Sequence, residues 1–272
     1  MKTFLTGWGL ALTLLAAPSW AASLPEATRD AMTRADVVLL GEIHDNPAHH
    51  MVQAEAVRAI APAAVVWEMM TEEVAQGVDA AVIGDPEALA ARTGWEASGW
   101  PRLELYLPVF EAARNAVHYG ALVPRSAVGG VIAEGAVAAF GPEAARFGLS
   151  DPLPAAEQAE READQQAAHC NAMPEDKLGL LVDIQRLRDA TLARTVLRAL
   201  QDTGGPVAVI TGNGHVRADR GVPVYLHRAA PNLVVYTLGQ SEDGRLGGTF
   251  DAVIDSPAVA RPDPCAAFAN RP

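Results

Sequence analysis

The chain has little cysteine. Its 272 residues include only Cys170 and Cys265, and neither belongs to a Cys-x-x-Cys pair. This spacing argues against a redox dithiol and against a zinc knuckle. A disulfide between the two cysteines requires an oxidising compartment, so whether they pair depends on where the protein is located.

The sequence also lacks any run of basic residues and, beyond its first residues, any long apolar run. Its formal net charge is −12, which argues against nucleic acid and anionic lipid as general partners. A membrane helix needs about 20 apolar residues, so we expect no membrane span in the mature chain. Half of the residues are hydrophobic, which is enough for one large domain with a sizeable core.

Residues 1–21 are interpreted as a secretory signal peptide. Lys2 gives a positive start, residues 4–17 are almost entirely apolar, and Ser19-Trp20-Ala21 offers small residues to a signal peptidase. We expect cleavage after Ala21 and export. In an oxidising compartment we predict a disulfide between Cys170 and Cys265, the alternative being two unpaired thiols.

Short apolar runs alternate with helical stretches, which is typical of an α/β fold with a mostly parallel central sheet flanked by helices. The expected strands are 37–41, 64–67, 122–123, 207–211, 224–226, 233–238 and 252–254. The first helix after the 37–41 strand is expected to start at Pro47, with Asn46 or Asp45 as its N-cap, and to end before Pro62.

The alternation is interrupted between the third and fourth strands. A polar run and then a long amphipathic helix over about 175–201 predict an inserted helical lobe at about 141–203. We therefore expect a single α/β domain over 22–255, with this lobe inside it, followed by a Pro-rich tail over 256–272. The predicted disulfide would tie the tail to the lobe.

Polar side chains follow the expected strands where these end. Glu42 and His44 follow the first strand, Glu68 the second and His215 the fourth. The carboxyl ends of parallel strands line the ligand crevice, so we expect the four side chains to converge there. Carboxylates and imidazoles bind divalent metal ions, which predicts a metal site, and Glu42 with His44 would be the catalytic pair of a hydrolase. The structural alternative is that Glu42 only caps or pairs with the next helix.

Further candidates carry weaker signals. Arg125, after the 122–123 run, suits an anionic group of a ligand or neutralises a carboxylate. His49 and His50 are expected to be solvent-exposed in the first turn of a helix, and His227 to be structural on a strand. His118-Tyr119 and His169-Cys170 contain side chains that haem iron accepts as ligands.

Several of these segments form an ordered set of motifs. They are Gly41-Glu42-Ile43-His44-Asp45-Asn46, Trp67-Glu68-Met69, Trp100-Pro101 with Tyr106-Leu107-Pro108, Ala168-His169-Cys170, Gln185-Arg186-Leu187-Arg188-Asp189-Ala190, Gly212-Asn213-Gly214-His215-Val216-Arg217 and Gly221-Val222-Pro223-Val224-Tyr225-Leu226. Together, over about 35–238, they resemble the ChaN-like haem-binding uptake family of the wider Tiki/TraB and erythromycin-esterase superfamily.

The resemblance implies an α/β core with an inserted helical part, export to the periplasm, and binding of haem or iron in an uptake role. Haem or another porphyrin is the ligand that it implies, with Tyr106 or His169 nearest the iron and Arg125 among the cations for the propionates. Haem held between two protomers of a homodimer is left open. The chain lacks the lipobox cysteine of lipoprotein members, which argues against an outer-membrane anchor.

Two functions therefore compete, and a third is left open. The first is a periplasmic haem- or iron-binding protein of an uptake system, which holds its ligand in a crevice at the strand ends. The second is a metal-dependent hydrolase, of protease or esterase type, that uses the Glu/His site. Against it, the chain has no Gly-x-Ser-x-Gly elbow and no His-Glu-x-x-His motif. The third is an exported protein that only binds a small organic ligand in the crevice.

Overall fold

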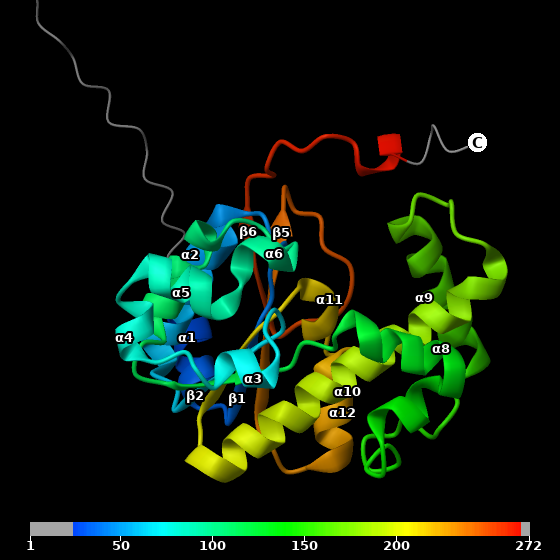
Figure 1. Ribbon diagram of the computed structural model, residues 1–272, viewed down its shortest axis with the longest axis horizontal. Coiled ribbons are helices and arrows are strands. Elements are labelled where there is room, and N and C mark those ends of the chain that lie inside the picture. Colours follow the sequence, from blue (N-terminus) through cyan, green and yellow to red (C-terminus); the bar gives the residue numbers. More distant parts are fainter. Residues whose placement is uncertain (1–23, 268–272) are drawn as a thin grey trace, which may run out of the picture.

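The computed structural model describes residues 24–267, so the predicted signal peptide lies outside the described residues. Six strands form one parallel sheet in the order β3-β2-β4-β1-β5-β6 (Figure 1). The strands are β1 (Val37–Leu40), β2 (Ala64–Trp67), β3 (Val117–Gly120), β4 (Val207–Ile210), β5 (Val235–Glu242) and β6 (Ala252–Ser256). The predicted α/β class with a parallel central sheet is confirmed.

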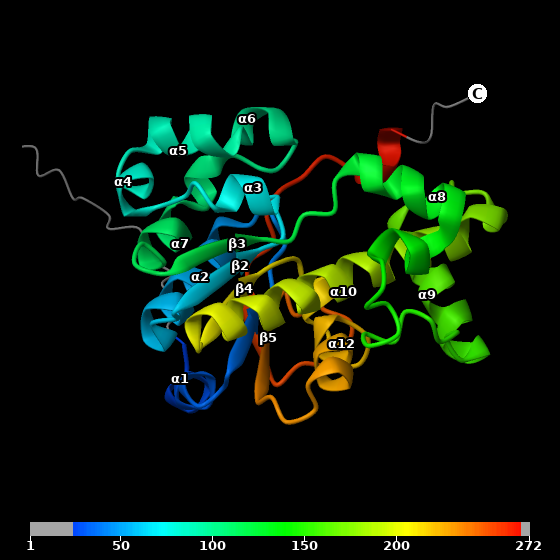
Figure 2. The same cartoon turned by 60° about the horizontal axis from the view of Figure 1, so that its bottom comes forward.

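Helices cover both faces of the sheet (Figure 2). The α-helices are α1 (Glu26–Thr33), α2 (Pro47–Ile60), α3 (Glu72–Ala75), α4 (Ala80–Ile83), α5 (Pro86–Thr93), α6 (Trp95–Ser98), α7 (Leu107–Ala112), α8 (Arg125–Phe140), α9 (Ala155–Ala168), α10 (Leu178–Thr203), α11 (Asn213–Val216) and α12 (Val222–Ala229). Three short 3-10 helices are η1 (Leu103–Leu105), η2 (Glu175–Lys177) and η3 (Pro264–Ala267). Among residues 24–267, no helix combines the length and apolarity that crossing a membrane requires.

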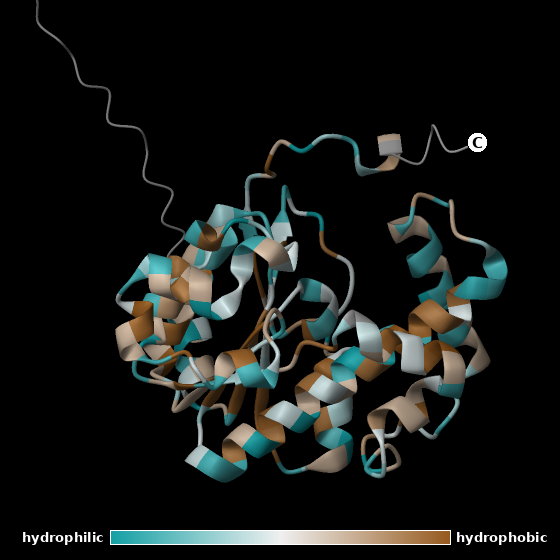
Figure 3. Cartoon of the chain, in the orientation of Figure 1, coloured by the Kyte–Doolittle hydropathy of each residue, from teal (hydrophilic) through white to brown (hydrophobic). Residues whose placement is uncertain are grey.

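The strands are apolar throughout because both of their faces are covered. Along β1, Val38 and Leu40 join one hydrophobic core with α2 and α7, whereas Val37 and Leu39 join a second core with α10 and α12. Side chains alternate between the faces of a strand, so continuous apolar runs are what a sheet buried on both faces needs. Figure 3 shows strands rich in hydrophobic residues, flanked by helices in which hydrophobic and hydrophilic residues are mixed.

Helix α2 begins as the sequence predicts. Asn46 is its N-cap and accepts a hydrogen bond from the Ala48 backbone N–H, and Pro47 occupies the first helical position. The helix ends at Ile60, where Ala61 takes a left-handed conformation ahead of Pro62. This well-marked start fixes the direction in which the chain leaves β1.

The connections leaving β1 and β4 run in opposite directions along the sheet. These two strands are neighbours, yet β1 leads through α2 to β2 on one side, and β4 leads through α11 and α12 to β5 on the other. In open α/β sheets, ligands generally bind near such a reversal, at the carboxyl ends of the strands. The fold therefore places the residues after β1 and β4 at a natural ligand position.

Two predicted strands are wrong. Leu122 and Val123 lie in the loop after the third strand, which is formed by Val117–Gly120 instead. The predicted strand over 224–226 is part of helix α12, because Val222, Tyr225 and Leu226 recur at helical spacing and are buried together. His227 is consequently an exposed helical residue and not a strand residue.

The helices between β3 and β4 begin earlier than expected, at Arg125, and include α8, α9 and α10. The predicted long helix over about 175–201 is confirmed as η2 followed by α10. This helix packs along the sheet beneath β2, β3 and β4, whereas α8 and α9 extend away from the sheet (Figures 1 and 2). The domain limits drawn from sequence stay a prediction.

The segment after β6 is tied down at two points. The Arg261 guanidinium pairs with Asp45, in the loop after β1, and with Glu242 at the end of β5, at N–O distances of 2.6 to 2.7 Å. The Arg261 hydrogen bond holds the pKa of Glu242 at about 2. Further along, Cys265 forms a disulfide with Cys170, with Cα atoms 5.4 Å apart. The predicted link between the tail and the helical lobe is thus present.

Removing the disulfide should lower the free energy of unfolding by at most about 4–5 kcal/mol, the loop-closure figure for a loop of this length. Cys170→Ser, Cys265→Ser and the double variant should lose the same amount, because each removes the same bond. Urea unfolding of all three against oxidised wild type measures this. Full stability in all three variants would contradict a paired state.

Candidate functional site

The structure brings together the polar residues that follow β1, β2 and β4. A Cβ atom added at Gly212, just after β4, would lie 3.0 Å from Nε2 of His44 and 3.8 Å from Oε2 of Glu68. His215 follows three residues later and contacts Glu68. Residues far apart in sequence therefore meet at the carboxyl ends of β1, β2 and β4, as the parallel arrangement of the strands predicted.

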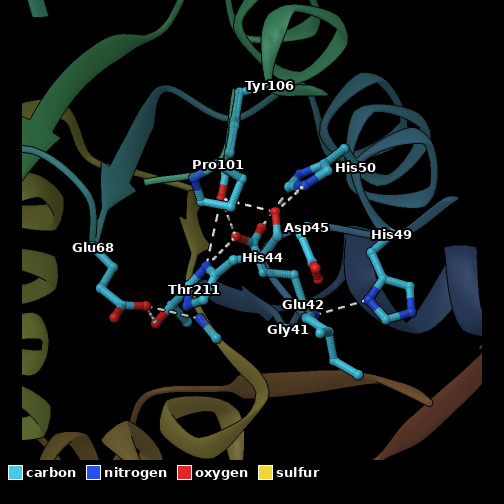
Figure 4. Close-up of polar contacts among 12 residues, drawn as sticks. Gly41, Glu42, His44, Asp45, His49, His50, Glu68, Pro101, Tyr106 and Thr211 are labelled. Atoms are coloured by element: carbon cyan, nitrogen blue, oxygen red, sulfur yellow. Dashed lines mark hydrogen bonds and ion pairs between the residues drawn. The ribbon is translucent and has the colours of Figure 1, made fainter. Parts of the chain in front are cut away.

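Glu42 is the centre of a buried hydrogen-bond network (Figure 4). Its Oε1 accepts from Nδ1 of His44 at 2.6 Å and from the Tyr106 hydroxyl at 2.7 Å. Its Oε2 accepts from the Gln53 amide at 2.7 Å and lies 3.5 Å from Nδ1 of His50. Burial raises the pKa of Glu42, but the hydrogen bond from His44 and the nearby His50 outweigh burial, so the carboxyl stays ionised with a lowered pKa.

His44 is hydrogen-bonded through only one of its two ring nitrogens. Its Nδ1 is bound to Glu42, its ring packs against Trp100 at a centroid distance of 4.9 Å, and 30% of its side chain is exposed. Within residues 24–267, its Nε2 makes no hydrogen bond. Burial lowers the pKa of His44, but the hydrogen bond and charge of Glu42 raise it above the ordinary value. The site thus contains one imidazole nitrogen without a hydrogen-bond partner among the described residues, and this nitrogen lies close to Gly212.

Glu68, His215 and Asp189 form a second chain of charged groups. Oε2 of Glu68 accepts from the Thr211 hydroxyl at 2.7 Å and from the Gly212 backbone N–H at 2.8 Å (Figure 4). His215 lies between the carboxylates, with Nδ1 2.6 Å from Asp189 and Nε2 3.4 Å from Glu68. Burial lowers the pKa of His215, but the two carboxylates outweigh it and raise the pKa to about 10.

His49 and His50 are fully buried, so the expectation that they are solvent-exposed is wrong. Nδ1 of His49 accepts from the Ile43 backbone N–H, and its Nε2 lies 3.0 Å from the Ser256 hydroxyl. His50 donates from Nε2 to the His44 carbonyl at 2.9 Å. Both rings hold the loop after β1 in place, because the first turn of α2 is buried against that loop and against β5 and β6.

The four residues predicted to bind a metal do not form a metal centre. Among the described residues, no group of three or more His, Cys, Asp or Glu side chains is arranged to hold a metal ion. Glu42, Glu68 and His215 direct their polar atoms at protein partners, with His215 bridging two carboxylates. The arrangement does not support the predicted divalent metal.

The three residues that the sequence analysis predicted to contact haem lie in different parts of the structure. Tyr106 is fully buried, and burial and Glu42 raise the pKa of its hydroxyl well above the usual range. His169 ends α9 in the helical lobe, where its Nδ1 donates to the Gln165 carbonyl at 2.8 Å. The backbone of Arg125 opens α8, but its side chain lies outside what the structure describes. Their roles toward haem stay predictions.

A cavity of about 100 Å³ adjoins Glu68 at the mouth of the site. It is lined by Trp100, Ala121, Leu122, Val123, Arg188 and Leu192 in addition to Glu68. A larger cavity of about 460 Å³, on the side of α10 that carries Arg194 and Arg198, shares Ala121 and Leu122 as walls. Apolar surface and a cationic side chain therefore lie beside the charged site.

Arg188 is the cation that this cavity exposes. It projects from α10 and, within the part of the chain described, makes no ion pair or hydrogen bond. Its neighbour Arg186 is buried and donates to the carbonyls of Gly148 and Asp151, so it is occupied in holding a loop. Of these two arginines, only Arg188 is free to meet an anionic group.

Two buried partners of the site were not singled out from the sequence. Gln53 holds Glu42, and Asp189 holds His215. Both are polar residues on the buried, mainly apolar face of a helix, Gln53 beside Ala56 and Val57 on α2, and Asp189 beside Ala190 and Ala193 on α10. A polar side chain on such a face needs a buried partner, and this was the available signal.

Asp189→Asn should make the protein less stable and shift its alkaline unfolding to lower pH. A histidine whose folded pKa is raised contributes stability that is complete below pH 6.5 and is lost as the pH rises through about 10. Removing Asp189 lowers the folded pKa of His215 and should cost about 3 kcal/mol at pH 7.

Urea unfolding between pH 6 and 10.5 measures this shift. Asp183→Asn, a more exposed aspartate on the same helix, is the control and should behave like wild type. If the free energy of unfolding falls with rising pH in the same way in wild type and in Asp189→Asn, Asp189 is not coupled to His215.

The comparisons with known proteins place this site in a family. The family model described as haem-binding uptake, Tiki superfamily, ChaN, matches residues 29–226. The fold is similar to the solved structure of ChaN of Campylobacter jejuni, described as showing cofacial haem binding, with a TM-score of 0.58 and 18% identity over 82% of this chain and 87% of that one. No curated protein matches in sequence. The chain belongs to the haem-binding uptake family of ChaN within the Tiki superfamily.

Proposed function

We propose that this protein is a periplasmic haem-binding protein of an iron-uptake system, and that it holds haem in the crevice at the carboxyl ends of β1, β2 and β4. Membership of the family supports haem as the ligand. The observation that supports this location for haem is a group of three features at the strand ends. They are the imidazole nitrogen of His44 that has no hydrogen-bond partner, a cavity with apolar walls, and an arginine without an ion pair among the described residues. Export rests on the predicted cleavage after Ala21.

The residues at the crevice fit the chemistry of haem. A porphyrin needs apolar contacts for its ring, which Trp100, Val123 and Leu192 offer, and a cation for its propionates, which Arg188 offers. The cavity beside Glu68 is far smaller than a porphyrin. A bound porphyrin would therefore have to extend beyond this cavity, toward the larger one that shares Ala121 and Leu122 as walls.

The hydrolase alternative is not favoured. It requires the Glu/His residues to hold a metal ion, whereas their polar atoms are directed at one another and at Thr211, Gln53 and Tyr106. A buried carboxylate that already accepts several hydrogen bonds gains little from a further partner. The Glu/His network is thus better suited to holding the crevice in shape than to activating water through a metal.

Titration of the metal-free, processed protein with haemin should give a saturable Soret band at one haem per chain. Arg188→Gln should weaken haem affinity about fivefold, because an exposed ion pair is worth roughly 1 kcal/mol. Arg58→Gln, an exposed arginine in the last turn of α2, is the matched control and should not change affinity. Absence of any saturable Soret change in wild type would rule out the haem-binding function.

The partly enclosed ring also favours a homodimer of the loaded protein. Haem lying across the mouth would leave one apolar face uncovered, and a second chain carrying its own haem would cover that face. Light scattering after size-exclusion chromatography should therefore give a single-chain mass without haem and a doubled mass with it. A single-chain mass in both states would contradict the dimer but not haem binding.

A further inference from the structure

The cavity of about 460 Å³ lies between α10, the loop after β3 and the segment that follows α8. Helix α10 packs against both β3 and α8 in this region (Figure 2). The charged residues that line the cavity are different from Glu68 and Arg188, which line the smaller cavity at the strand ends. Its volume is in the range of pockets that hold small organic molecules, and its polar side chains have no part in the proposed haem site.

One face of α10 forms a polar wall of this cavity. The four residues on that face are Thr191, Arg194, Thr195 and Arg198. Their spacing of i, i+3, i+4 and i+7 places them on the same side of the helix. Apolar lining comes from Ala121, Leu122, Phe147 and Leu197. A molecule in the cavity would therefore meet hydroxyl and guanidinium groups as well as an apolar surface.

The charges that line the cavity do not balance. Arg146 pairs with Glu143 at 3.0 Å. Arg198 pairs with Glu72. Arg194 is the third arginine, and among the described residues no carboxylate lies within ion-pair distance of it. Three arginines against two glutamates leave one positive charge, in a chain whose formal net charge is −12. A local positive charge of this kind favours an anion.

Arg194 is held in place but keeps donors for a ligand. Its Nη1 donates to the Phe140 carbonyl at 3.0 Å, and its guanidinium lies 4.1 Å from the centroid of the Phe140 ring. A guanidinium has five N–H donors, and this is its one hydrogen bond within residues 24–267. Burial lowers the pKa of Arg194, and the like charge of Arg198 lowers it further, although Glu143 opposes the shift. A bound anion would offset both effects.

Thr195 adds a hydroxyl that is not used within the protein. The residue is only 6% exposed, yet its hydroxyl makes no hydrogen bond among the described residues. The other threonines of α10, Thr191 and Thr203, each donate to the carbonyl four residues earlier. A buried hydroxyl without a partner is costly. A hydrogen bond from Thr195 to a ligand in the cavity would remove this cost.

We infer that this cavity is a second ligand site, which binds a small organic molecule through a carboxylate or phosphate group held by Arg194 and Thr195. Arginine binds either group through two parallel N–H···O bonds, and a hydroxyl can donate to the same oxygens. The inference does not depend on haem binding. The structural alternative is that Arg194 only joins α10 to Phe140 at the end of α8, in which case its loss would change stability and no ligand would bind.

The test is isothermal titration calorimetry of the processed, haem-free chain with phenyl phosphate and with benzoate, at constant ionic strength. At least one probe should bind saturably at about one molecule per chain, and the tighter probe identifies the preferred group. Benzamide, which lacks the charge, should not bind. Arg194→Gln should weaken binding at least about tenfold and Thr195→Val about fivefold. Thr203→Val on the same helix and the exposed Arg58→Gln are the matched controls and should bind like wild type.

The inference is wrong if neither probe binds saturably, or if wild type and Arg194→Gln bind equally well. If Arg194→Gln does not fold, Thr195→Val and Arg194→Lys decide, since lysine keeps the charge but loses the planar fork and should weaken binding. Saturation with haemin should leave the tighter probe bound. Displacement of the probe by haemin would show that the cavity accepts haem propionates and would overturn a separate ligand. Circular dichroism establishes that each variant is folded.

Discussion

The buried negative charge of Glu42 is the constraint on which the site depends. A carboxylate removed from water is costly unless it is paired and hydrogen-bonded, and Glu42 accepts from His44, Tyr106 and Gln53 at 2.6 to 2.7 Å. These partners come from the loop after β1, from the segment preceding α7 and from α2. Satisfying one charge therefore fixes the positions of three segments relative to the strand ends. His44 owes its orientation to this network.

The two glycines that precede the site are required by close approaches and not by unusual backbone angles. A Cβ at Gly41 would lie 2.3 Å from Oδ1 of Asn213, whose side chain bonds the backbone N–H and carbonyl of Gln240 across the end of β1. A Cβ at Gly212 would lie 3.0 Å from His44. Each glycine makes room for a side chain from the other strand's motif. The resemblance between the two segments thus has a physical reason, because they are packed against each other.

The segment after β6 returns to the site from the other end of the chain. Arg261 joins Asp45, the residue after His44, to Glu242, and the disulfide continues the connection to α9. The sheet edge, the loop after β1 and the helical lobe are thereby linked to one another. Since the lobe helices α8 and α9 extend away from the sheet, this link limits how far they can move from the strand ends.

Much of the fold could be read from the sequence because the signals involved are local. Apolar runs marked β1, β2 and β4, and the Asn46-Pro47 pair marked the start of α2. The parallel arrangement implied that Glu42, Glu68 and His215 would meet. Where local patterns were ambiguous the prediction was wrong. The short Val224–Leu226 run suits a strand or a buried helix equally, and only its packing against α10 decided for helix.

The hydrogen-bond partners of the charged residues could not be predicted from the sequence. These pairings follow from side-chain packing between segments that are, in some cases, more than a hundred residues apart. Packing brings Gln53 and Tyr106 to Glu42, and it places His215 between Glu68 and Asp189. It also leaves Nε2 of His44 without a hydrogen-bond partner among the described residues. The sequence by itself determined which polar groups reach the strand ends. The tertiary structure decided which of these groups bind each other and which remain without a partner. The reason is that hydrogen-bond pairing depends on distances that only the folded chain sets.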